Sequence, residues 1–129
     1  MRKIVVSIQN GLLAEAITGM LNDSGEFQPF RVPVGNKKND VISNCEMLSA
    51  DILIAEVSYA SGTTVEARLR EVKDVRKNVP ACKIVLLCDE NSAPDIAREV
   101  TLAKKDGLID NFFYSSVTAK YLLAALVSL

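Results

Sequence analysis

Residues 50–57 read Ala-Asp-Ile-Leu-Ile-Ala-Glu-Val, an apolar run that is interrupted only at Asp51 and Glu56. A nearly continuous apolar run of this length predicts a strand that is buried on both faces. The carboxylate of Glu56, close to the end of the run, would cost free energy if it were buried without a partner. Glu56 is therefore expected at an open edge of a sheet, where chemistry or recognition takes place.

Strand and helix patterns alternate outward from this run in both directions. Strands are expected at residues 2–8, 27–34, 51–57, 83–88 and 110–114, and apolar residues recur at helical spacing after each strand. Pro29 and Pro33 indicate that the second strand lies at an edge, since proline cannot donate to a strand ladder. Five strand–helix units predict an α/β fold, namely a doubly wound parallel sheet with helices on both faces.

Side chains at the helix ends and on the helix surfaces give more local predictions. Thr63, with Glu66 three residues later, predicts a capping box at the start of the third helix. Ser116 predicts the N-cap of the last helix. The charged clusters at residues 68–71 and 104–106 are interpreted as solvated helix faces.

The composition excludes several kinds of function. The chain has 129 residues, enough for one domain, with 15 basic and 16 acidic side chains, so it lacks the basic excess of a dedicated nucleic-acid binder. It contains no histidine, which removes Ser-His and Cys-His nucleophilic pairs and histidine metal ligands. Three cysteines, an odd number, predict reduced thiols and a cytoplasmic location. No apolar run has the length of a membrane span or a secretory signal, so no membrane contact is expected.

Taken in order, these features resemble the receiver domains of bacterial response regulators, the CheY-like modules of two-component signalling. The resemblance rests on residues 50–57, on Gly62 six positions after Glu56, on Gly107 seven positions before Tyr114, and on Asn-Gly-Leu-Leu at residues 10–13. It covers essentially the whole chain as one domain, residues 1–129, which would suit the N-terminal part of a longer regulator. It implies a flavodoxin-like five-stranded sheet of order 2-1-3-4-5, with Glu56, Gln9, Asp89 and Tyr114 converging at one edge.

Receivers of this family hold Mg²⁺ with an acidic pair and an acceptor aspartate, and the metal and a lysine neutralise the charge on the transferred phosphoryl group. This chain departs from the pattern at each of these positions. The resemblance places the acidic pair at Ile8 and Gln9, the acceptor at Glu56, the hydroxyl at Cys88, the lysine at Tyr114 and the aromatic switch at Asn111. We therefore expect a degenerate receiver that is not an enzyme, binds no metal or cofactor, and is not phosphorylated by the family's mechanism.

Several alternatives remain open at this point. Glu56 is either a constitutive mimic of a phosphorylated acceptor or an ordinary solvated carboxylate. An atypical phosphoacceptor receiver would use Glu56 or Asp89, and Asp89 and Glu90 could join Glu56 in holding a cation. Cys88 could act as a reactive thiol, although no histidine is present to activate it. A flavodoxin-like cofactor-binding protein is a further and less favoured alternative.

The resemblance also implies how the domain meets its partners. The face made by the fourth helix, the fifth strand and the fifth helix is the first candidate for contact with a protein partner or for self-association. Residues 98–120 mix both signs of charge, which predicts a weak homodimer whose affinity falls with added salt. No direct contact of this domain with nucleic acid is expected.

Overall fold

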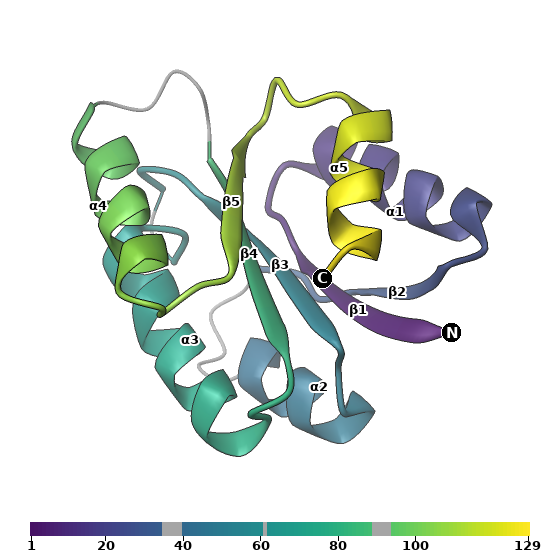
Figure 1. The fold of residues 1–129 in the computed structure, drawn as a ribbon, viewed down its shortest axis with the longest axis horizontal. Coiled ribbons are helices and arrows are strands. Elements are labelled where there is room, and N and C mark those ends of the chain that lie inside the picture. The colour runs from purple at the N-terminus through teal and green to yellow at the C-terminus, as the bar shows by residue number, and fades with distance from the viewer. Residues whose placement is uncertain (35–39, 61, 89–93) are drawn as a thin grey trace.

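The computed structural model describes residues 1–34, 40–60, 62–88 and 94–129, and it shows a five-stranded sheet in which all strand pairs are parallel (Figure 1). The strand order is β2-β1-β3-β4-β5, so the predicted flavodoxin-like, CheY-like fold is confirmed. The strands and helices in chain order are β1 (Arg2–Ser7), α1 (Gly11–Ser24), β2 (Phe27–Arg31), α2 (Asp40–Leu48), β3 (Ile52–Val57), α3 (Val65–Asn78), β4 (Lys83–Cys88), α4 (Pro94–Lys105), β5 (Asn111–Tyr114) and α5 (Ala119–Val127).

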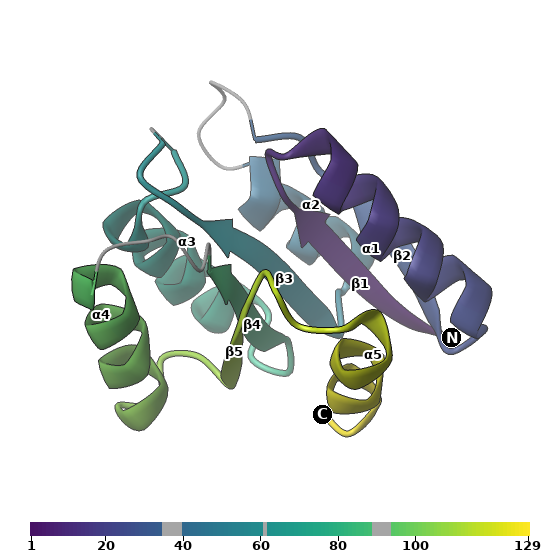
Figure 2. The ribbon, with the colours of Figure 1, turned by 90° about the horizontal axis from the view of Figure 1, so that it is seen from above.

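The strands place alternate side chains in two apolar clusters, one on each face of the sheet. In β3, Ile52 and Ile54 belong to the cluster that α1 and α5 cover. The neighbouring Leu53 and Ala55 belong to the cluster that α2, α3 and α4 cover (Figure 2). Strands buried on both faces need an apolar side chain at nearly every position, which explains the uninterrupted runs in β3 and β4. Among the helices that the structure describes, none is long and apolar enough to span a membrane.

Two predicted helix caps are wrong, and each error is small in position. Thr64, and not Thr63, caps α3, because the Thr64 hydroxyl accepts a hydrogen bond of 3.2 Å from the backbone N–H of Ala67. Thr118, and not Ser116, caps α5, since residues 114–117 form a turn in which the Val117 N–H bonds the Tyr114 carbonyl at 2.9 Å. The last helix therefore begins later than the sequence indicated.

Candidate functional site

Glu56 is the next-to-last residue of β3, and it is half-buried. By the alternation of the strand it shares the face of Ile54, which α1 and α5 cover. Its Oε1 accepts a hydrogen bond of 3.0 Å from the backbone N–H of Gln9. The carboxylate is thus tied to the chain segment that follows β1, instead of projecting freely from the edge of the sheet.

The two positions that the resemblance assigns to the acidic pair differ sharply in their surroundings. Ile8 is completely buried in the cluster between the sheet and α1, whereas Gln9 is exposed and supplies its backbone N–H to Glu56. Mg²⁺ requires oxygen ligands, and one or two carboxylates usually anchor it. Glu56 is the single carboxylate among these three residues. No group of three or more His, Cys, Asp or Glu side chains within the described ranges could hold a metal ion.

Cys88 ends β4 on the opposite face of the sheet from Glu56. In the register of the sheet, Leu87 lies beside Glu56, while Cys88 lies beside Val57 and faces α2, α3 and α4. Only 1% of Cys88 is exposed, and burial raises the pKa of its thiol to about 11. The thiol is therefore protonated and shielded at neutral pH, which argues against the reactive-thiol interpretation.

The two predicted switch positions on β5 also lie away from Glu56. Tyr114 ends the strand beside Cys88 and packs edge-on against Phe112, with ring centroids 6.1 Å apart, so its ring lies on the α4 side of the sheet. Asn111 begins the strand, away from the carboxyl edge, and its Oδ1 accepts from the backbone N–H of Phe112 at 2.9 Å. Of the predicted site residues, the structure joins Glu56 and Gln9; Asp89 lies outside the described residues.

Arg68 is a residue beside the candidate site whose position was predicted wrongly from the sequence. Its position in the charged cluster at residues 68–71 indicated a solvated face, but only 1% of Arg68 is exposed. Its guanidinium donates four hydrogen bonds directly beneath the candidate site. The acceptors are the Glu56 carbonyl at 2.7 Å, the Ser7 hydroxyl and the Ser7 carbonyl at 2.9 Å each, and the Glu71 carboxylate at 3.2 Å.

These bonds fasten three elements together. Ser7 ends β1, Glu56 lies at the end of β3, and Arg68 and Glu71 belong to the first half of α3. Burial lowers the pKa of the Arg68 guanidinium, and the nearby carboxylates of Glu71 and Glu56 oppose that shift. An arginine keeps its charge in proteins even so, because its unperturbed pKa lies far above neutral pH. The site is therefore built over a fixed, buried cation that holds the backbone of its two central strands.

The described residues of the loop between β3 and α3, which follows Glu56 closely in the chain, are held by hydrogen bonds to one another. The Ser58 and Thr63 hydroxyls lie 2.7 Å apart, and the Ser58 N–H bonds the Thr63 carbonyl at 2.8 Å. Gly62 has a φ of +86°, a conformation that other residues adopt only with strain. Thr63 is used in closing this loop, which explains why Thr64 is left to cap the helix.

A small hollow lies beside the hydrogen bonds of Arg68. It lies beside Ser7, Gly62, Arg68 and Glu71 and has a volume of about 50 Å³. Small-molecule sites usually measure roughly 300–1,000 Å³. This one hollow is therefore smaller than a usual small-molecule site.

Comparison with known proteins establishes the fold. No protein-family model matches the sequence, and no curated protein matches it. Among solved structures, the chain is similar to a LuxR-family DNA-binding response regulator from Staphylococcus aureus, with 11% identity, a TM-score of 0.76, and 99% of this chain and 98% of that chain covered. It is similar to the chemotaxis protein CheY4 of Vibrio cholerae, with 17% identity, a TM-score of 0.72 and coverages of 98% and 96%. A third structure, described as pilus assembly-related and from Burkholderia pseudomallei, has 16% identity, a TM-score of 0.70 and coverages of 98% and 87%. The protein thus has the fold of response-regulator receiver domains.

Proposed function

We propose that the protein is a receiver-like module of bacterial two-component-type regulation that works through protein–protein contacts and without phosphorylation of Glu56. The observation that carries this proposal is the pair of positions after β1, where Ile8 is a core residue and Gln9 bonds Glu56 through its backbone. In the family's mechanism a metal ion and a lysine neutralise the developing charge. Of the three positions that correspond to the acidic pair and the acceptor, Glu56 alone carries a carboxylate, and Tyr114 at the lysine position turns to the other face of the sheet.

The magnitude of this loss supports an inactive acceptor. Removing one preorganised electrostatic element from an active site typically costs about 3–4 kcal/mol of activation free energy. Two such elements are replaced in this chain, so the barrier should rise enough to make phosphorylation negligible on a signalling timescale. The proposal therefore treats the protein as a binding module and not as an enzyme that catalyses its own phosphorylation.

An atypical acceptor that uses Glu56 or Asp89 is the second candidate, because Glu56 does stand at the carboxyl edge of the sheet. The two candidates differ in their response to Mg²⁺. Ligand binding to the folded state raises the melting temperature, so an inactive acceptor should show no shift in millimolar Mg²⁺, with or without beryllofluoride. A shift that grows when beryllofluoride is added would favour the atypical acceptor.

Gln9→Asp provides a matched control for that experiment. Gln9 is exposed, and its contact with Glu56 uses the backbone N–H, which the substitution retains. The variant adds a second carboxylate beside Glu56, so it should gain a Mg²⁺-dependent rise in melting temperature that the natural chain lacks. An equal response of both proteins would contradict the proposal.

The surface made by α4, β5 and α5 is the proposed contact face. Tyr114 is 42% exposed and Tyr121 is 65% exposed, and Lys104 and Lys120 are exposed nearby. Aromatic side chains of this kind are enriched at interfaces because they contribute large contact areas. We expect a weak homodimer that dissociates as salt is added, measured by sedimentation at several concentrations. A strict monomer at high concentration and low salt would remove self-association from the proposal.

A further inference from the structure

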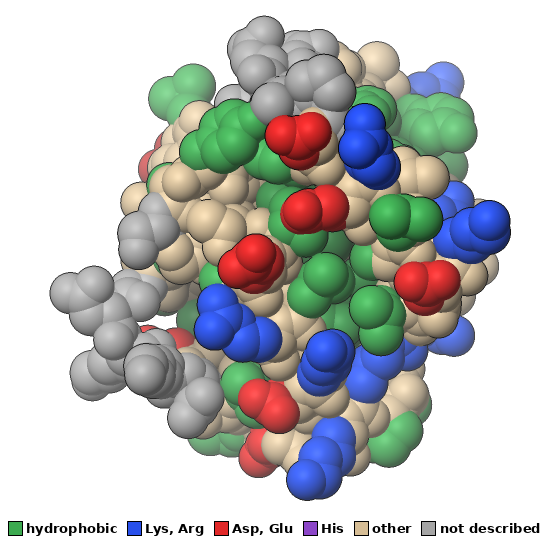
Figure 3. Space-filling view, turned by 90° about the vertical axis from the view of Figure 1, so that its left-hand side faces the viewer, with side chains coloured by type: hydrophobic (Ala, Val, Ile, Leu, Met, Phe, Trp, Pro, Cys, Tyr) green, Lys and Arg blue, Asp and Glu red, His purple; other side chains and the backbone are tan. Residues whose placement is uncertain are grey.

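A long hollow runs between α3 and α4, on the side of the molecule shown in Figure 3. Two adjoining parts, of about 310 and 290 Å³, share Val65, Glu66 and Glu99 in their walls. Its floor is apolar and includes Leu69 and Leu102, and Leu102 is 50% exposed although its helix packs against the sheet. An exposed apolar floor within a groove is a common feature of protein-binding surfaces.

The rim of this α3–α4 groove is acidic. Glu66 on α3, Asp95 and Glu99 on α4, and Asp106 just beyond α4 line it, and all four are exposed. In Figure 3, acidic side chains border the apolar centre of this face. Basic side chains also occur on the face, but among the described residues that line the groove there is no lysine or arginine.

Among the described residues, none of these four carboxylates forms an ion pair. The two ion pairs within the described ranges are Arg68–Glu71 and Arg76–Asp110, and neither involves the groove. Asp95 and Glu99 are four residues apart on one helix, where like charges destabilise the helix by about 0.2–0.5 kcal/mol. A cationic partner would relieve this repulsion on binding, so the groove is electrostatically complementary to a basic ligand.

We propose that the α3–α4 groove binds a basic, amphipathic helical segment of a partner protein. The apolar side of such a helix would lie on Leu69 and Leu102, and its lysines or arginines would reach the carboxylates on both rims. The 12 residues of α4 set the length of the groove, and a helix of about 14 residues, about 21 Å long, would span it. This inference deepens the proposed function by naming the chemistry of a partner, and it does not depend on whether Glu56 accepts a phosphoryl group.

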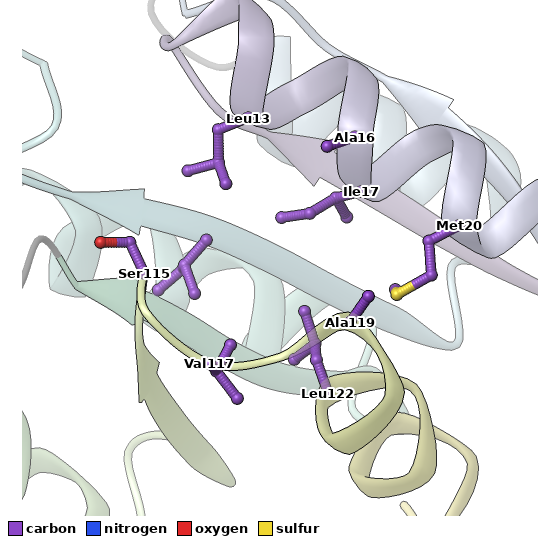
Figure 4. A pocket seen from close by; sticks show the side chains of 9 residues that line it. Leu13, Ala16, Ile17, Met20, Ser115, Val117, Ala119 and Leu122 are labelled. Atoms are coloured by element: carbon purple, nitrogen blue, oxygen red, sulfur yellow. The ribbon is translucent and has the colours of Figure 1, made fainter.

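A second groove lies between α1 and α5, and it lacks the charged rim that indicates a ligand for the α3–α4 groove. Figure 4 shows Leu13, Ile17 and Met20 of α1 facing Val117 and Leu122 across it. Its volume is about 110 Å³, and none of the residues that line it is charged. Its walls therefore do not indicate the chemistry of an occupant, whereas the rim of the α3–α4 groove does.

The test uses the full chain and a fluorescein-labelled probe peptide of about 14 residues, with leucines at helical i, i+3, i+4 and i+7 spacing and lysines elsewhere. A scrambled peptide of the same composition, with no apolar stripe, is the ligand control. Fluorescence anisotropy at low salt should show binding of the probe at least about fivefold tighter than binding of the scrambled peptide, and added salt should weaken it. Amide NMR spectra should place the perturbed resonances on α3 and α4. Equal binding of both peptides, no binding of the probe, or perturbations centred on α1 and α5 would each overturn the proposal.

Two charge-reversal variants test whether the probe peptide binds at the α3–α4 groove. Glu99→Lys removes an attractive charge from the groove and adds a repulsive one, which should weaken probe binding roughly fivefold to tenfold. Glu15→Lys makes the same change in net charge on the exposed surface of α1, on the other side of the sheet, and should change binding less than about twofold. Circular dichroism verifies that both variants are folded, as expected for exposed positions. If the two variants weaken binding equally, attraction to net charge explains the binding and the groove does not.

Discussion

Arg68 gives the most demanding test of how the site is built. We consider Arg68→Met, which retains an unbranched side chain and fills much of the same space but removes the charge and all five N–H donors. The Glu56 carbonyl, the Ser7 carbonyl and the Ser7 hydroxyl would each lose the partner that they have at 2.7–2.9 Å. Two of these three contacts are fully buried, so these acceptors would lose their donor away from bulk water.

The expected loss follows from those acceptors. Each buried acceptor left without a partner costs about 1–3 kcal/mol. A part of this is offset, because the variant no longer has to bury a cation away from water. Glu71, whose side chain is 24% exposed, can be hydrated when its partner is removed and adds little. We therefore expect Arg68→Met to lower the free energy of unfolding by about 3–5 kcal/mol.

Urea unfolding, followed by circular dichroism, measures this loss. Small proteins have slopes of about 1–3 kcal/mol per molar urea, so at an intermediate slope of about 2 the midpoint should fall by roughly 1.5–2.5 M. Arg70→Met is the matched control, since Arg70 is exposed on the same helix and its change should stay within about 0.5 kcal/mol. If Arg68→Met is as stable as Arg70→Met, the buried guanidinium does not hold the strands and the description of the site is wrong.

Three further predictions concern individual positions. Thr64→Ala should destabilise the protein by about 1 kcal/mol in urea unfolding through loss of the α3 cap, whereas Ser116→Ala, at a position that caps no helix, should have little effect. A larger loss in Ser116→Ala than in Thr64→Ala would contradict this assignment of the caps. Gly62→Ala should cost about 1–2 kcal/mol in the same assay because of its positive φ, and an unchanged midpoint would refute that strain. Cys88 has a pKa raised from 9.0 to about 11, so the folded state keeps its proton as pH rises through this range while the unfolded state loses it. Stability should consequently fall between about pH 9 and 11, by less in Cys88→Ala, and equal pH profiles of the two proteins would count against the shift.

The sequence predicts the fold because several independent features agree with it. The apolar runs at residues 50–57 and 83–88 require a sheet covered on both faces, and the prolines near β2 place that strand at an edge, as observed. The caps were harder to predict, since Thr63 and Thr64 are adjacent and both can serve chemically. Only the loop bonds of Thr63 to Ser58 and Ala60 decide between them.

The candidate site was less predictable for two physical reasons. Neighbouring residues of a strand point to opposite faces of the sheet. Glu56 and Cys88 both lie near the carboxyl ends of apolar strands, but they differ by one residue in the register, so their side chains lie on opposite faces. Arg68 was assigned to the surface because of its charge and its charged neighbours. Its spacing from Val65, Val72 and Val75 places it on the buried stripe of α3, and that periodicity was the signal that could have identified it.

Under the proposed function, Glu56 accepts no phosphoryl group. Intact-protein mass spectrometry after long incubation with acetyl phosphate and Mg²⁺ tests it most directly, with a phosphorylatable receiver treated in parallel to verify the reagent. The mass of the natural chain should be unchanged. The mass of Glu56→Asp should be unchanged too, because Ile8, Gln9 and Tyr114 still supply neither a metal site nor a lysine. The added mass of one acid-labile phosphoryl group, mapped to Glu56 or to Asp89, would contradict the claim and establish the atypical acceptor in its place.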